Sequence, residues 1–217
     1  MADFLTNGNV AVAGRATGNR ELITSSNILK WLAQGKVFSA GLGCEETAVD
    51  SEAALADVSP TFGLFAPSGE TTIVLPLYAS FSVTGEGGAA NVVQCAVTKA
   101  ANNCGTAMTK SGTALSKQNC NALYNTPPQA TALSTITVSA LTTSDYLSLF
   151  TATAADNLIS TAGGAQFMNT VLEIDMLKHP VILAAGAALL IYAYTGTSDS
   201  TLTPYFQWAE LTLDDLI

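Results

Sequence analysis

The sequence predicts an all-β protein, an antiparallel β-sandwich preceded by an extended N-terminal arm and one short helix. Two patterns carry this prediction. Residues 72–83 alternate between apolar and other side chains over their whole length, which is typical of a half-buried strand. Further apolar runs of strand length recur along the chain, separated by turns rich in glycine, proline and serine. Neither pattern suits a bundle of long helices.

The composition points to a surface that other subunits cover. Only 12% of the 217 residues are charged, against about 25% in ordinary soluble domains. The net charge is −9, and the eight basic residues are dispersed along the chain. Direct nucleic-acid binding is therefore not expected, because no basic stripe is available to displace phosphate counterions. A weakly charged surface is instead typical of a protein that works within an assembly.

The chain divides into an arm, residues 1–57, and a sandwich, residues 58–217. Within the arm, residues 25–35 read as a short helix, with a serine cap at its start and Gly35 at its end. Three apolar side chains of this helix form the predicted docking site of the arm: Ile28, Trp31 and Leu32. A neighbouring subunit is one candidate to hold the arm, and its own domain is the other.

The sandwich is expected to contain strands at residues 72–83, 92–97, 131–139, 146–152, 170–176 and at the C-terminus. Pro76 cannot donate to a β-ladder and marks an edge or a bend in the first of these. The polar stretch between Lys99 and Pro128 shows no clear period and reads as a long loop. Loops of that length are usually functional or interfacial.

The stretch from Pro180 to Gly196 contains an uninterrupted apolar run, Val181–Tyr194. A membrane helix needs about 20 apolar residues, and this run is shorter and carries Gly186 in its middle. The sequence predicts instead a hairpin with a strand at 181–183, a turn at 184–187 and a strand at 187–195. The second strand is apolar on both faces, so either a loop or another subunit must cover the surplus face.

The C-terminal strand is also aromatic, with Phe206, Trp208 and Glu210 on one face. Large aromatic side chains dominate the energetics of subunit contacts. The predicted subunit interface consists of Leu190, Tyr192, Tyr194, Phe206 and Trp208. As an alternative, an aromatic platform for carbohydrate could be formed by Tyr124, Tyr146, Tyr205, Phe206 and Trp208. Core or interface packing is the favoured reading of these aromatic side chains.

No residue pattern supports catalysis, a cofactor or a metal site. His179 is the single histidine, so a histidine cluster for a metal cannot form, and we interpret it as a turn residue. The glycine-rich residues 85–90 loosely match a dinucleotide-binding loop but fit a β-connection better. Glu173 and Asp175 share a strand face and are interpreted as solvated. We therefore expect a protein that is not an enzyme.

The cysteines and the first residues indicate in which cellular compartment the protein is expected. The four cysteines contain no Cys-x-x-Cys pair, and the first residues lack the charged and apolar regions of a secretory signal. Free thiols are the default expectation, and a bridge between Cys104 and Cys120 remains open.

Three stretches carry a resemblance to a known class of proteins: "PTFGLFAPSGETTIVLPLYASFSV", "SGTALSKQNCN" and "VILAAGAALLIYAYTG" with "YFQWAEL". They resemble bacteriophage virion structural proteins of the jelly-roll type. The resemblance implies a jelly-roll β-sandwich that acts as a capsid decoration or cement protein in the virion. It also implies a homotrimer that binds a major capsid protein or another virion protein. A tail or fibre component, or a receptor- or carbohydrate-binding module, is the alternative.

Overall fold

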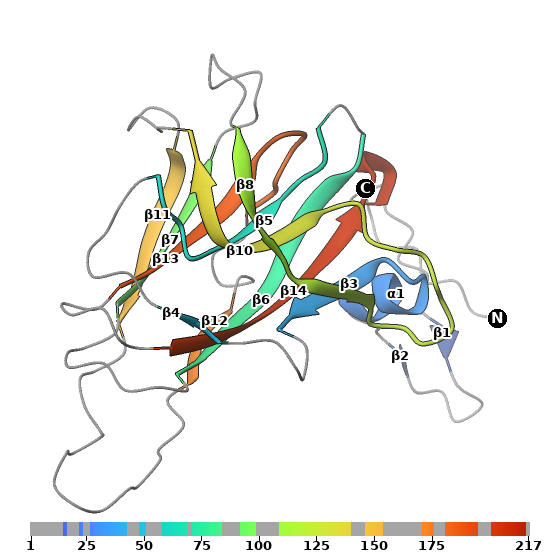
Figure 1. Cartoon of the computed structure of the whole chain (residues 1–217). Helices are drawn as coiled ribbons and strands as arrows, with labels where there is room; N and C mark the ends of the chain where they lie inside the picture. Colours follow the sequence, from blue (N-terminus) through green and yellow to red (C-terminus); the bar gives the residue numbers. More distant parts are fainter. Residues whose placement is uncertain are drawn as a thin grey trace, which may run out of the picture.

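A computed structural model describes residues 15–16, 22–23, 27–42, 48–50, 58–68, 71–83, 92–98, 109–139, 146–153, 171–175, 181–194 and 201–215. These residues form a short helix, α1 (Asn27–Ala33), a ribbon of β1 (Arg15–Ala16) and β2 (Leu22–Ile23), and two larger antiparallel sheets (Figure 1). The predicted all-β sandwich is confirmed, and α1 lies within the predicted helix.

Each large sheet is named here after its central strand. The β13 sheet has the strand order β11 (Tyr146–Thr153), β7 (Val92–Thr98), β13 (Ala188–Tyr194), β5 (Phe62–Phe65), β10 (Thr131–Val138) and β8 (Lys110–Ala114). The β14 sheet has the order β12 (Val171–Asp175), β6 (Ile73–Val83), β14 (Thr201–Leu211), β3 (Val37–Gly41) and β9 (Ser116–Asn119). The short strand β4 (Val49–Asp50) also pairs with β14.

The pairing of the strands is that of a jelly roll. β3 pairs with β14, β5 with β13, β6 with β12, and β7 with β11, all antiparallel. Among these strands the first along the chain thus pairs with the last, the second with the next to last, and so on inward. This nesting wraps the chain into two facing sheets, as in jelly rolls. β8, β9 and β10 form an insertion between β7 and β11, and they widen both sheets on the same side.

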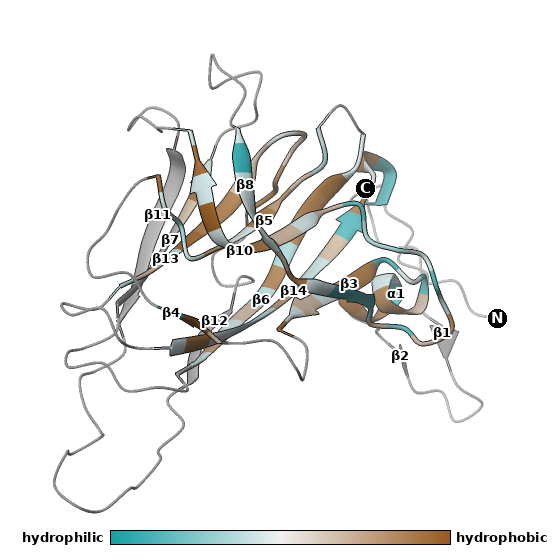
Figure 2. Ribbon diagram, viewed as in Figure 1, coloured by the Kyte–Doolittle hydropathy of each residue, from teal (hydrophilic) through white to brown (hydrophobic). Residues whose placement is uncertain are grey.

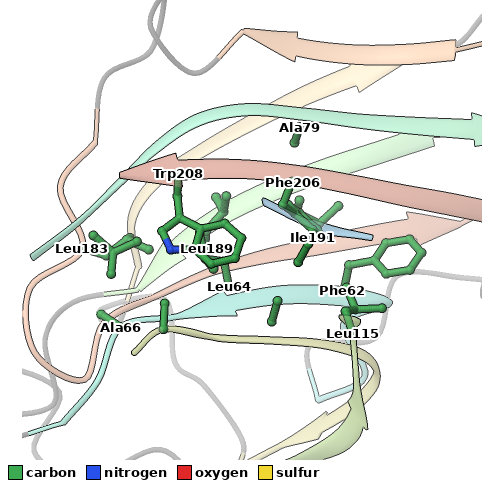
Figure 3. Packing of buried hydrophobic residues seen from close by; sticks show 14 of the residues in the cluster. Phe62, Leu64, Ala66, Ala79, Leu115, Leu183, Leu189, Ile191, Phe206 and Trp208 are labelled. Carbon is green, nitrogen blue, oxygen red and sulfur yellow. The ribbon is translucent and has the colours of Figure 1, made fainter. Parts of the chain in front are cut away.

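The core between the sheets is aromatic at its centre. Phe62 of β5 stacks on Phe81 of β6 with ring centroids 5.4 Å apart, and Phe206 of β14 meets Phe81 edge-on at 5.8 Å. Phe206 and Trp208 project from β14 toward Ile191 and Leu189 of the opposite sheet (Figure 3). Figure 2 shows the hydrophobic colouring that runs along β6 and β13. Burial of these apolar side chains is the main force that holds the sheets together.

The alternation in β6 changes face at a β-bulge. Tyr78 lies opposite Gln207 of β14, but Pro76 lies opposite Trp208, so Leu77 is the extra residue. Ala79 and Phe81 therefore face the core between the sheets, whereas Ile73 and Leu77 face outward in a separate cluster beneath α1. The prediction that these side chains share one face is wrong for this reason. Pro76 marks a bend, as expected, and the strand is interior rather than an edge.

The predicted turn before β13 is present, but the predicted hairpin is wrong. Ala187 donates its backbone N–H to the carbonyl of Ala184, and Gly186 takes a positive φ of 77° that favours glycine. Leu183 pairs with Val74 of β6, whereas β13 lies in the other sheet between β5 and β7. The turn therefore carries the chain from one sheet to the other. The apolar run of residues 181–194 therefore forms a corner between the two sheets.

The predicted boundary at residue 57 does not separate the arm from the sandwich. β3 lies in the β14 sheet between β14 and β9, and β4 extends the same sheet. Both strands precede residue 58. The sandwich thus begins at β3, and α1 packs directly on it.

Glu210 joins the two sheets at one end of the sandwich. Its Oε1 accepts hydrogen bonds from the indole Nε1 of Trp208 at 3.0 Å and from the backbone N–H of Ala130 at 2.9 Å. Its Oε2 accepts from the backbone N–H of Gln129 at 2.9 Å. Because residues 129 and 130 lead into β10, a carboxylate of one sheet fixes the start of a strand in the other.

Replacing Glu210 by alanine leaves three donors without their acceptor. We expect the Glu210→Ala variant to lose about 2–3 kcal/mol of unfolding free energy, since unsatisfied donors cost about 1–3 kcal/mol each and this site is half-buried. Urea denaturation measures the loss. Asp214→Ala, at an exposed carboxylate four residues further along the chain, is the control and should change stability little. Equal stability of the two variants would contradict the bridging role.

Candidate functional site

Most of the predicted subunit interface is buried within the single chain. Phe206 and Trp208 lie between the sheets, in the main core. Leu190 and Tyr192 are 0% and 4% exposed on the other face of β13, in a second cluster that also contains Ile136. A side chain that its own chain encloses has no surface left for a partner, so these four are core residues. Tyr194 is half-buried at the margin of the second cluster.

The second cluster is closed by a bulge in β10. The register between β10 and β8 shifts between Ser134 and Thr137, and Thr135 takes a positive φ of 48°, which is uncommon for threonine. Ile136 then lies over Gly63 of β5, where an added Cβ would come within 2.9 Å of its Cδ1. The surplus apolar face of β13 is thus covered in part by the insertion.

The predicted docking residues hold α1 on its own domain. Trp31 is buried against the outer face of the β14 sheet, in a cluster with Val37, Leu77 and Leu211, and Ile28 and Leu32 pack at its border. Leu29, which the helical pattern places in the same apolar patch, points away and is 57% exposed. These three side chains therefore contact the sandwich of their own chain, and docking of the arm on a neighbouring subunit stays a prediction.

Two asparagines of the insertion clamp the C-terminal end of α1. The side-chain amide of Asn121 donates to the carbonyl of Leu32 at 2.9 Å, and that of Asn119 donates to the carbonyl of Gly35 at 2.8 Å. Their oxygens accept from the backbone: Asn119 Oδ1 from Asn121 N–H, and Asn121 Oδ1 from Leu123 N–H. Carbonyls in the last turn of a helix lack partners from a following turn, and here the insertion donates to the Leu32 carbonyl, which also accepts the Gly35 N–H at 3.0 Å.

Exposed apolar side chains lie on this clamped unit. Leu123 is 90% exposed and Tyr124 is 42% exposed, although the Tyr124 ring rests on Gly35, where an added Cβ would come within 2.4 Å of it. Gly35 has a φ of 69° and ends the helix as the sequence predicted. We call Leu29, Leu123 and Tyr124 the helix–loop surface. Singly exposed apolar side chains are common on protein surfaces; what distinguishes Leu123 and Tyr124 is that the Asn121 side chain holds the Leu123 backbone and that Gly35 supports the Tyr124 ring.

The stretch predicted as a loop between Lys99 and Pro128 contains two strands in its described part, which begins at residue 109. β8 is exposed along its whole length, and β9 is exposed over its first three residues. Both are edge strands with water-facing side chains, so they lack the apolar alternation by which strands are recognised. Lys110 of β8 folds its side chain back, so that its Nζ lies 4.2 Å from the centroid of the Phe65 ring. The partial burial of the ammonium group there lowers the pKa of Lys110.

An ion pair ties the end of the chain to the α1–β3 turn. Lys36 donates to the carboxylate of Asp215, which also accepts from the backbone N–H of Thr212 at 2.8 Å and from its hydroxyl at 2.9 Å. The hydrogen bond from Lys36, followed by that from the Thr212 backbone, lowers the pKa of Asp215 from 3.8 to about 2. Asp215 thus caps the 3-10 turn at residues 213–215, since its side chain accepts the Thr212 N–H while its own backbone N–H donates to the Thr212 carbonyl at 3.1 Å.

Several predicted sites lie outside the described residues or have side chains that are not described. These are His179, residues 85–90, Cys104, and the side chain of Tyr146. Glu173 and Asp175 lie on β12 opposite Ser80 and Tyr78, as their strand assignment predicted. The aromatic platform is not assembled, because Phe206 and Trp208 are core residues and Tyr124 lies on the helix–loop surface, whereas Tyr205 pairs with Tyr78.

The described residues also bear on metal binding and on membrane insertion. No group of three or more histidine, cysteine, aspartate or glutamate side chains within those ranges is placed to hold a metal ion. The helical segments in the same ranges are too short or too polar to cross a membrane. Cys120 is a free thiol that accepts a long contact of 3.7 Å from Gln207 Nε2. Comparison with known proteins identifies no matching family model, curated protein or solved structure.

The asparagine clamp is testable by hydrogen exchange. We expect Asn119→Ala/Asn121→Ala to accelerate amide exchange in α1 and in residues 119–124, because four hydrogen bonds of about 1 kcal/mol each are removed. Exchange in β13, in the core, should be far less affected. Gln118→Ala, at an exposed neighbour on β9, is the matched control. Unchanged exchange in α1 of the double variant would show that the clamp contributes nothing.

The Lys36–Asp215 pair predicts a defined pH dependence. Because the pKa of Asp215 is lowered to about 2 in the folded state, its stabilising effect is complete above its ordinary pKa and is lost as the pH falls toward 2. Asp215→Asn should therefore be less stable than the wild type by about 1 kcal/mol at neutral pH, and the difference should vanish between about pH 4 and pH 2. Denaturant titrations across this range measure it. For Asp214→Asn a difference with the same pH dependence would contradict the assignment to Asp215.

Proposed function

We propose that this protein is a virion structural protein that associates with its own copies and binds a capsid shell, which it stabilises as a decoration or cement protein. The observation that carries the proposal is the helix–loop surface on a jelly roll. Jelly rolls are common in viral capsid proteins, although a fold alone does not determine function. The specific support comes from the exposed side chains that the insertion adds to this fold.

The helix–loop surface has the properties of a preformed contact. Leu123 projects from a loop whose backbone is held by the asparagine clamp, and Tyr124 is braced by Gly35. A fixed loop loses little conformational entropy on binding, so more of its contact energy is available for affinity. Aromatic and large apolar anchors are the side chains that dominate interface energetics. Residues 119–124 therefore form the best candidate for attachment to a larger particle.

The low charge of the chain supports the same proposal. Only 12% of the residues are charged, and covering uncharged side chains with a neighbour costs far less free energy than covering unpaired charges. Partners expected on this reading are further copies of the chain and a major capsid protein or another virion protein. No enzymatic step, cofactor or metal forms part of the proposal.

A receptor- or carbohydrate-binding role is the second candidate, and one observation favours it. Tyr205 is 39% exposed on the outer face of the β14 sheet and lies beside Tyr78, with ring centroids 6.3 Å apart. Lectin domains also use jelly rolls. A glycan that binds the wild type but not Tyr205→Ala would favour this role. We prefer the shell-binding role, because this pair of rings lacks the further aromatic residues that the platform required.

Attachment is testable with particles. The chain should co-purify with virions or capsids through a density gradient at a constant ratio to the major capsid protein. Leu123→Asp should release it, since a charge at the centre of an apolar contact costs several kcal/mol. The matched control is Ile182→Asp, which places the same charge on another exposed aliphatic residue. Ile182 lies beside β6, and β14 separates β6 from β3, on which α1 packs. Absence of the wild-type chain from particles, or equal attachment of both variants, would contradict the proposal.

A further inference from the structure

The insertion supplies the edge strand of each sheet on the same side of the sandwich. β8 ends the β13 sheet and β9 ends the β14 sheet, and the two strands are separated only by Leu115, whose buried side chain enters the main core. On the opposite side of the sandwich, β11 and β12 lie next to each other. In the described part of the chain no strand pairs with the outer side of β8.

The hydrogen-bond pattern shows which backbone groups of β8 are directed outward. Leu115 donates its N–H to Ala132, and Ser139 donates its N–H to Thr109. Along an antiparallel strand the ladder groups alternate in direction. The odd-numbered residues of this strand therefore bond to β10, whereas Lys110, Gly112 and Ala114 present their N–H and C=O groups to the outside.

The side chains of this edge do not protect it. Natural edge strands are usually guarded by lysines, prolines or inward-pointing charges. Lys110 instead lies back over the Phe65 ring, and Lys117 of β9 donates to the carbonyl of Ala130 at 2.7 Å. Gly112 has no side chain, and no proline interrupts residues 110–119. The outward groups of β8 are thus accessible to another extended strand.

We propose that β8 pairs with β8 of a second copy of this chain, antiparallel and two-fold symmetric about Gly112. In this register Gly112 lies opposite its own copy, Lys110 lies opposite Ala114, and Ser111 lies opposite Thr113. About six backbone hydrogen bonds form across the contact. The small hydroxyl side chains at the facing positions are favourable cross-strand neighbours.

Charge favours the second copy as the occupant. The two Lys110 side chains start four residues apart along the paired strands, about 14 Å, which exceeds the Debye length of about 8 Å at physiological ionic strength. No like charges therefore face each other, and the segment is self-complementary in size and polarity. The contact concerns self-association alone and uses none of the helix–loop surface. It can thus hold or fail independently of shell attachment.

The symmetry of this contact distinguishes it from a three-fold assembly. A two-fold contact closes at two copies, or joins larger units in even numbers. The jelly-roll phage resemblance implied a trimer. Sedimentation velocity over a concentration series, with no shell present, should therefore show the full-length chain at twice its 22.3 kDa mass, or an even multiple of that mass. A monomer, or a trimer without even-numbered forms, would overturn the proposal.

A charge-swap series tests the register. In Ser111→Glu/Thr113→Glu, glutamates face glutamates twice, and the dimer should dissociate with a rise of at least tenfold in its dissociation constant. Ser111→Glu/Thr113→Lys places opposite charges at the same positions and should remain a dimer. Both variants alter exposed side chains only, and equal melting temperatures show that both are folded. Dimerisation of the two variants with equal affinity would refute the register.

Cysteine pairs give a second measurement. Ser111 and Thr113 of the two copies form a non-hydrogen-bonded pair, with Cα atoms about 4.5 Å apart, which is within the range for a disulfide. A mixture of Ser111→Cys and Thr113→Cys chains should form a disulfide-linked mixed dimer on mild oxidation. Neither variant alone should do so beyond the wild-type level, because identical positions lie too far apart. Cross-linking of either variant alone as efficiently as the mixture would overturn the two-fold pairing at Gly112.

Discussion

Apolar burial holds the two sheets together, and the carboxylate of Glu210 is the polar interaction that fixes one sheet to the other at one end of the sandwich. Trp208 is the largest fully buried side chain of the core, and its indole N–H needs an acceptor in an apolar interior. Glu210, two residues along the same strand face, supplies it and also accepts the backbone N–H groups of Gln129 and Ala130. One polar group thus satisfies the core tryptophan and sets the point at which the insertion re-enters the opposite sheet. From that point β10 continues along its ladder with β5, and β8 pairs with β10 at the edge of the sheet.

The sequence could predict those parts of the fold that depend on local pattern. Strand positions followed from alternation and turn residues, and the C-terminal end of α1 from Gly35, because side-chain direction and turn conformation are set over a few residues. The assignment of strands to sheets was not accessible in the same way. Leu183 and Leu189 lie on opposite sides of one turn, yet a hairpin and a corner between sheets require the same residues there. The bulge at Leu77 was hidden for a related reason, since both of the faces that it connects are apolar and buried.

The candidate site was less predictable than the fold. A strand with two apolar faces, such as β13, has two physical explanations, namely a second core of its own chain or a partner subunit. Here Ile136 is one of the side chains of the same chain that cover this face, and it lies over Gly63 next to the bulge and the positive φ of Thr135 in β10. The side chains of β8 gave no signal at all, since an edge strand exposed to water needs no apolar period. Apolar periodicity in a sequence indicates which side chains are buried. The proposed contacts involve the exposed residues of β8 and Leu123, for which this periodicity gives no information.

The way in which the insertion is fastened explains how it can serve assembly without weakening the domain. Apart from Leu115 and the β10 residues, it contributes little to the core; strand pairing with β5 and β3 holds it, together with polar contacts that Asn119, Asn121 and Glu210 make to the backbone. Such contacts fix geometry while they leave the outer surface free, and their loss would loosen the insertion before it unfolded the jelly roll. An element built in this way can present Leu123 on one side and the bare strand β8 on the other. Two separate contacts, one to a shell and one to a second copy, can then be made at the same time by a single rigid insertion.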